Sequence, residues 1–262
     1  MALSIETCVA QHIGDRKEQQ DRVTLLPHPT RPGMLLAVLA DGMGGHTGGA
    51  MAAEQIIHKA GTSFEVYAPA SESPKEILRN IIDEAHIVIK LTRFTSEQDP
   101  HSTACVLLFQ PTRVDWAYCG DSRIYHFRGD KLISKTMDHS YVNELVRLGR
   151  ISVEEAETHP QKNVLLGCLG SERPPTIDFG ETSPLADQDI FLLCSDGLWG
   201  YFSDAELGGV LAAHQPRAAA EILIQRARDR AHGGGDNCSL AIIKLVDKKA
   251  DKPVPPKPAG MD

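Results

Sequence analysis

The sequence predicts an α+β fold in which antiparallel sheets are covered by helices. Short apolar runs bounded by turn-forming residues predict strands. One of them, 123–127, turns through Arg128-Gly129-Asp130 into 131–134, as a hairpin does. The helical patterns are grouped between and after pairs of strands, which favours helix-covered sheets over an alternating parallel fold.

The other elements follow from the same patterns. Ser73-Pro74-Lys75-Glu76 has the capping-box spacing with proline at the first helical position, and an apolar stripe continues over 77–89. Ser203 opens a later helix, and Pro216 begins another that runs toward residue 230. The predicted strands are 23–26, 34–40, 103–109, 114–118, 123–127, 131–134, 190–194 and 239–246.

Size and composition indicate one catalytic domain over residues 1–246. With 262 residues and 42% hydrophobic content, the chain can bury a full core in one domain. Residues 138–175 carry loops and short helical patterns, so we expect a flap-like insertion there. Residues 247–262 combine lysine with proline, which predicts a disordered tail.

Composition also limits the partners and the location. The net charge of −8 argues against nucleic acid or an anionic membrane as the main partner, because phosphate backbones need a basic stripe. The first residues lack the regions of a signal peptide, and no apolar run is long enough to span a membrane. We therefore expect a cytoplasmic monomer whose six scattered cysteines are reduced thiols.

Aspartates at the ends of apolar runs are the most informative feature of the chain. Asp41, Asp121 and Asp196 each follow such a run, and Asp236 lies just before one. A single Asp-Gly pair after a strand is usually only a turn. Four of these sites together place carboxylates on rigid supports, where a small neighbouring residue lets a backbone carbonyl approach a ligand.

Carboxylate and carbonyl oxygens favour Mg²⁺ or Mn²⁺ over zinc and softer metals. Metal-assisted hydrolysis of a phosphate ester is therefore the leading hypothesis from the residues themselves. A cysteine nucleophile is disfavoured, because Cys194 would lie among acidic groups that oppose thiolate formation.

Four short motifs occur in the order in which a known family carries them. They are ADGMGGH at 40–46, GDSR at 120–123, SDGLW at 195–199 and GDN at 235–237. The chain resembles the bacterial metal-dependent serine/threonine protein phosphatases of type 2C, from Arg16 to about Val246. The resemblance implies a four-layer sandwich of two packed antiparallel sheets flanked by helices, with metals in a cleft at one edge.

The resemblance also implies a set of metal ligands. Asp41 would bridge two Mn²⁺ or Mg²⁺ ions, and the carbonyl of Gly42 would bind one of them. Asp196 and Asp236 would complete the first site, and Asp121 with Asp196 would hold a weaker third ion.

Two further residues receive roles from the resemblance. Arg16 matches the family arginine that contacts the substrate phosphate, a role that suits a planar guanidinium; the alternative is a surface arginine near a turn. Asp21 would lie outside the metal ligands and orient a water molecule. Gln20 precedes it where the family often has an acidic residue, which removes a charge from the surroundings of the metals.

The leaving-group acid has no assignment. Animal relatives carry a histidine two positions after the bridging aspartate, but Met43 occupies that position here. His46 and His139 are candidates, and the alternative for each is a hydrogen bond to the backbone.

The expected function is hydrolysis of phosphoserine and phosphothreonine on proteins by a metal-activated water, without a covalent phosphoenzyme. The partners would be a serine/threonine kinase and its phosphorylated substrates. One alternative is a catalytically weak phosphoprotein-binding regulatory module of the same fold. Another is a small-molecule phosphoesterase, with the segment 138–175 deciding substrate choice.

Overall fold

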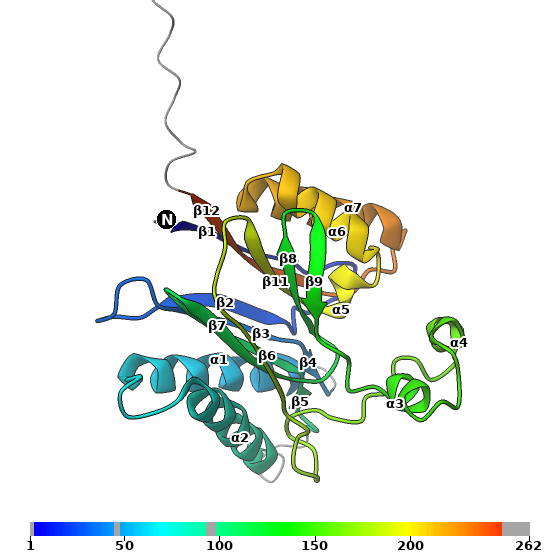
Figure 1. Ribbon diagram of the computed structural model, residues 1–262. Helices are drawn as coiled ribbons and strands as arrows, with labels where there is room; N and C mark the ends of the chain where they lie inside the picture. Colours follow the sequence, from blue (N-terminus) through cyan, green and yellow to red (C-terminus); the bar gives the residue numbers. More distant parts are fainter. Residues whose placement is uncertain (1–2, 45–47, 93–97, 248–262) are drawn as a thin grey trace, which may run out of the picture.

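Two five-stranded antiparallel sheets form the centre of the molecule (Figure 1). The computed structural model describes residues 3–44, 48–92 and 98–247. The first sheet, in order, contains β1 (Leu3–His12), β12 (Cys238–Asp247), β11 (Asp189–Cys194), β8 (Arg123–Arg128) and β9 (Lys131–Lys135). The second contains β10 (Asp178–Thr182), β7 (Arg113–Cys119), β6 (Ala104–Gln110), β3 (Leu35–Ala40) and β2 (Arg22–Pro27). A two-stranded sheet pairs β4 (Gly42–Met43) with β5 (His101–Ser102).

Helices cover the outer face of each sheet. The two long helices α1 (Gly48–Val66) and α2 (Pro74–Thr92) pack on the second sheet. The first sheet is covered by α6 (Asp204–Ala213) and α7 (Pro216–Ala231), with the short α5 (Asp196–Trp199) at one end. The layers are therefore helix, sheet, sheet and helix, which confirms the predicted α+β sandwich.

A third apolar cluster fills the space between the sheets. Leu39 and Leu107 from the second sheet meet Phe191 and Ile243 from the first, and all four are fully buried. Burial of these side chains stabilises the sandwich and holds the strand ends in fixed positions.

The helix starts agree with the capping signals in the sequence. The N–H of Ser73 donates to the Glu76 carboxylate at 2.7 Å, and the N–H of Glu76 donates to the Ser73 hydroxyl at 3.3 Å. Ser203 forms the same capping box with Glu206, and Pro216 lies in the first turn of α7. The structure adds α1, β1 and β10, which the sequence patterns did not predict.

The segment 138–175 contains α3 (Tyr141–Arg147) and α4 (Val153–Thr158), which stand away from the sandwich in Figure 1. At the other end, β12 includes Asp247, one residue beyond the predicted end of the domain. The remainder of the predicted tail, 248–262, lies outside the described residues. Within the described ranges, no helix combines the length and the apolar composition needed to cross a bilayer.

Candidate metal centre

The strand topology brings the four predicted aspartates to one edge of the sandwich. β3 leads into Asp41, and β7 leads through Gly120 into Asp121. Both strands pair antiparallel with β6, so their carboxyl ends lie at the same edge. In the first sheet β11 ends just before Asp196 and β12 begins just after Asp236, and these two strands are antiparallel neighbours.

Two glycines allow the aspartate loops to pack closely. A β-carbon at Gly197 would collide with the main-chain carbonyl of Asn237, so this glycine lets the Asp196 loop lie against the Asp236 loop. A β-carbon at Gly42 would likewise collide with the carbonyl of Gly49 at the start of α1. The glycines that follow Asp41 and Asp196 therefore have a packing reason.

Hydroxyl side chains tie the Asp41 and Asp121 loops together. The N–H of Asp41 donates to Thr103 Oγ1 at 3.1 Å, and the N–H of Thr103 donates to the Asp41 carbonyl at 2.9 Å. Thr103 Oγ1 is 2.7 Å from Ser122 Oγ, next to Asp121. From the sequence, this threonine is predicted only to begin the strand 103–109.

Asp21 lies behind the four aspartates in a buried position. It is 1% exposed, and Ser195 Oγ donates to its carboxylate at 2.8 Å. Ser195 directly precedes Asp196, so Asp21 contacts the loop of a proposed metal ligand through a single hydroxyl. This placement agrees with a role outside the metal ligands.

The carboxylates are electrostatically strained. Burial, followed by repulsion from Asp21, Asp196, Asp121 and Asp236, holds the pKa of Asp41 well above its ordinary value. Burial and the neighbouring Asp196 raise the pKa of Asp121 to about 7, and burial with Asp236 raises the pKa of Asp196 to about 6. Burial raises the pKa of Asp21 to about 7 against the Ser195 hydrogen bond, which lowers it. A bound cation would relieve this repulsion.

Arg16 lies beside this cluster. Its Nη2 donates to Asp236 Oδ2 at 2.5 Å, and the two side chains are 60% and 39% exposed. The guanidinium, predicted to contact substrate phosphate, therefore reaches the carboxylates themselves. Arg16 is thus a surface arginine that pairs with a proposed metal ligand.

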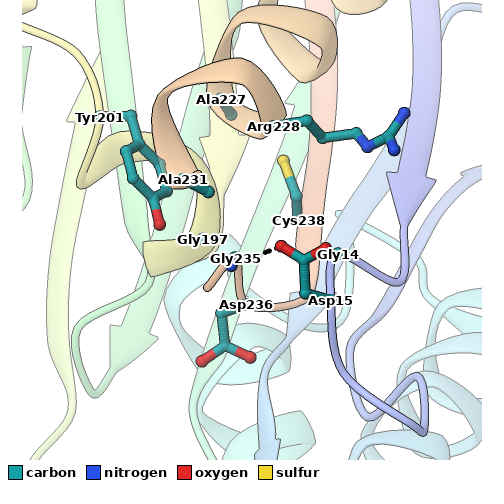
Figure 2. Close-up of a pocket in the computed structure, with 10 residues that line it drawn as sticks. All are labelled: Gly14, Asp15, Gly197, Tyr201, Ala227, Arg228, Ala231, Gly235, Asp236 and Cys238. Atoms are coloured by element: carbon teal, nitrogen blue, oxygen red, sulfur yellow. Dashed lines mark hydrogen bonds between the residues drawn. The ribbon is translucent and has the colours of Figure 1, made fainter. Parts of the chain in front are cut away.

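A small hollow lies under α7, next to the loop that carries Asp236 (Figure 2). Tyr201, Arg228 and Cys238 line the hollow, and the Asp236 carboxylate points away from them. Asp236 also lines the hollow, so its loop borders both the hollow and the carboxylate cluster.

The donor set fits a hard divalent cation. Among residues 3–44, 48–92 and 98–247, no three His, Cys, Asp or Glu side chains form a group that could hold an ion by themselves. Mg²⁺ typically uses one or two carboxylates and keeps several waters, so it does not require such a cage. The site offers oxygen ligands only and an excess of negative charge, which suits Mg²⁺ or Mn²⁺.

The histidine candidates differ in what the structure shows of them. The Nδ1 atom of His139 accepts the N–H of Gly120 at 3.2 Å, so Nε2 carries the proton and lies 3.2 Å from Asp178 Oδ2. Both ring nitrogens therefore have protein partners, which favours the backbone-binding alternative for His139. His46 lies outside the described residues.

Arg123 and Trp199 make contacts next to the Asp121 loop. Arg123 Nε and Nη2 donate to the two oxygens of Asp138 at 2.8 and 2.7 Å. The Arg123 guanidinium lies 3.4 Å from the ring centre of Trp199, whose Nε1 donates to the Asp121 carbonyl at 3.0 Å. Arg123 therefore pairs with a carboxylate, and both residues support the loop.

Comparison with known proteins identifies relatives of the chain. A family model described as Protein phosphatase 2C matches residues 9–228. The chain is 32% identical over 254 residues to protein phosphatase PhpP of Streptococcus pneumoniae, covering 96% of this chain and 100% of that protein. It is 33% identical over 224 residues to serine/threonine phosphatase stp of Listeria innocua, covering 82% and 87%.

Solved structures share the fold. The serine/threonine phosphatase of S. agalactiae has a TM-score of 0.83 at 30% identity, covering 93% of this chain and 100% of that chain. The catalytic domain of PstP, solved in complex with 2 manganese ions, has a TM-score of 0.75 at 28% identity, covering 94% and 100%.

Fold, sequence and relatives together define a metal-dependent protein serine/threonine phosphatase. The chain belongs to the protein phosphatase 2C family.

Proposed function

We propose that this protein removes phosphate from phosphoserine and phosphothreonine on proteins, and so reverses the action of a serine/threonine kinase. The observation that carries the proposal is the convergence of Asp41, Asp121, Asp196 and Asp236, with Asp41 under the influence of the other three charges. Phosphoryl transfer depends mainly on positioning and charge stabilisation, which such a cluster can provide once it is loaded with cations. The six free cysteines fit a cytoplasmic location.

The proposed ligands are the carboxylates of Asp41, Asp121, Asp196 and Asp236 and the carbonyl of Gly42, for two ions and a weaker third. When bound, Mn²⁺ or Mg²⁺ would supply charge neutralisation and acidify a water molecule for attack on phosphorus. Asp21 orients a water from its buried position beside Ser195, where its carboxylate is fixed by a hydrogen bond.

Arg16 is proposed to bind the phosphate oxygens. Its side chain is 60% exposed and already extends to the carboxylate edge, so a phosphate entering there would meet a guanidinium that is always charged. No side chain is required to form a covalent bond with phosphorus. Burial holds the pKa of Cys194, the cysteine nearest in sequence to Asp196, well above its ordinary value, so it stays a thiol.

The experiment compares phosphate release from a phosphothreonine peptide and from a small phosphate ester, with Mn²⁺ present. We expect release from the peptide, with a higher kcat/KM than for the small ester. Metal binding without release from either substrate would favour the regulatory-module alternative. Preference for the small ester would favour a small-molecule phosphoesterase.

A further inference from the structure

A single buried asparagine, Asn237, holds the loop that carries Arg16. Its Nδ2 donates to the carbonyls of Ile13 and Glu18 at 2.8 and 3.0 Å, and its Oδ1 accepts the N–H of Gln20 at 2.7 Å. Asn237 is only 5% exposed. Three hydrogen bonds from one side chain therefore span the main chain of residues 13–20.

The same loop is attached to the residues just before Asn237. The N–H of Asp15 donates to the Gly235 carbonyl at 2.9 Å, and the N–H of Gly235 donates to the Asp15 carboxylate at 2.8 Å (Figure 2). Residues 15–18 are exposed, so this part of the loop buries little apolar surface of its own. Its position therefore depends on hydrogen bonds to residues 235–237.

The chemistry of an amide is specific in this position. The donor end of Asn237 faces two carbonyls and the acceptor end faces an N–H, so both ends of the group are used. A carboxylate at 237 would have the same shape but would turn an acceptor toward those two carbonyls. An apolar side chain would leave buried main-chain groups without partners.

We propose that Asn237 is a positioning residue for Arg16. By fixing residues 13–20, it sets where the guanidinium stands relative to Asp236, to which Arg16 donates at 2.5 Å. The position of Arg16 then determines how well the site binds the phosphate of a substrate. This inference rests on the proposed function, in which Arg16 contacts that phosphate.

The loop itself supplies a direct readout, because trypsin cleaves after Arg16 and Lys17. We expect cleavage of the metal-free protein at these bonds to be at least roughly tenfold faster in Asn237→Ala, because the variant loses three hydrogen bonds and the net loss of about one is enough for that factor. Asn237→Asp should behave similarly. Asn80→Ala is the matched control, since Asn80 lies on α2 and donates to Glu72 at 2.9 Å, away from this loop.

Kinetics of the Mn²⁺-loaded protein test the link to phosphate. In Asn237→Ala, KM for a phosphothreonine peptide and the inhibition constant of inorganic phosphate should both rise, by a larger factor than kcat falls. The double variant Arg16→Ala with Asn237→Ala should be no worse than Arg16→Ala alone, because the two residues act as one unit. Mn²⁺ binding is measured in each variant, so that weaker phosphate binding is separated from loss of metal.

Unchanged cleavage at 16–17 in both variants, or losses that add in the double variant, would overturn the proposal. If Asn237→Ala does not fold, tryptic cleavage of Asn237→Asp, whose side chain has the same shape as asparagine, tests the proposal. Failure of the wild-type protein to release phosphate would instead contradict the proposed function. The tryptic readout needs neither metal nor turnover, so the two failures are distinguishable.

Discussion

Asp41 lies among like charges. Its neighbours Asp21, Asp121, Asp196 and Asp236 all raise its pKa, after the larger effect of burial. The sequence could predict the four strand-end aspartates, because each motif is local. It could not predict Ser195, Thr103 and Asn237 as supporting residues, because their contacts join loops that are far apart in the chain.

Neutralising Asp41 should separate stability from function. Asp41→Asn removes a repelled charge, so the metal-free protein should melt roughly 2–4 °C higher if about 1 kcal/mol is gained. The same variant should lose the stabilisation that Mn²⁺ gives the wild type. Thermal melts with chelator and with Mn²⁺ check both expectations, and Asp229→Asn, an exposed residue of α7, is the control. If Mn²⁺ raised the melting temperature of Asp41→Asn as much as that of Asp229→Asn, the role of Asp41 as a metal ligand would be contradicted.

The raised carboxyl pKa values predict an unusual pH dependence for the metal-free protein. Asp121 and Asp196 have folded pKa values of about 7 and about 6, against about 3.9 for an unfolded aspartate. Between these values the folded state holds more protons than the unfolded state. The free energy of unfolding should therefore fall as pH rises from about 4 to about 7. The slope is on the order of 1 kcal/mol per pH unit for each extra proton that the folded state holds.

Denaturant unfolding with chelator between pH 4.5 and pH 8 measures this slope. Asp121→Asn should have a smaller slope, and saturating Mn²⁺ should largely remove it. A metal-free wild type that gains stability across this window would contradict the electrostatic description of the site.

At the scale of elements, prediction succeeded where signals are local. The capping boxes at Ser73 and Ser203 mark real helix starts, and the 128–130 turn forms the expected hairpin. By contrast, α1 begins with Gly48-Gly49, which disfavours a helix, and has no acidic residue in its first turn. It forms because its buried face packs on the second sheet, which is a tertiary effect.

The Arg123–Asp138 pair joins β8 to the start of the 138–175 segment. The side chains are 19% and 9% exposed, and the contact is bidentate. Lysine keeps the charge but cannot make two parallel hydrogen bonds, so Arg123→Lys should lower the free energy of unfolding by about 1–3 kcal/mol.

Urea unfolding of Arg123→Lys measures this loss. The matched control is Arg147→Lys in α3, which alters an exposed pair with Glu144 and should change stability by less than about 0.5 kcal/mol. If the two substitutions lowered the free energy of unfolding equally, the Arg123–Asp138 contact would stabilise the protein no more than an exposed ion pair does.

At the scale of the whole molecule, the proposed metal centre depends on two sheets that end at one edge. β3 and β7 belong to the second sheet and β11 and β12 to the first, so neither sheet alone holds all four aspartates. The apolar core between the two sheets sets the distance between the sheets. Sequence patterns predicted the strands, but the pairing order, and with it the convergence, came only from the resemblance and the structure.

Phosphate release from a phosphothreonine peptide by metal-stripped protein, titrated with Mn²⁺, tests the metal centre most directly. We predict no release without metal, release restored by Mn²⁺, and loss of at least about 100-fold in Asp196→Ala. Asp229→Asn should match the wild type. Release that resists chelation, or that persists in Asp196→Ala, would contradict the assignment of the carboxylate cluster as the catalytic metal site.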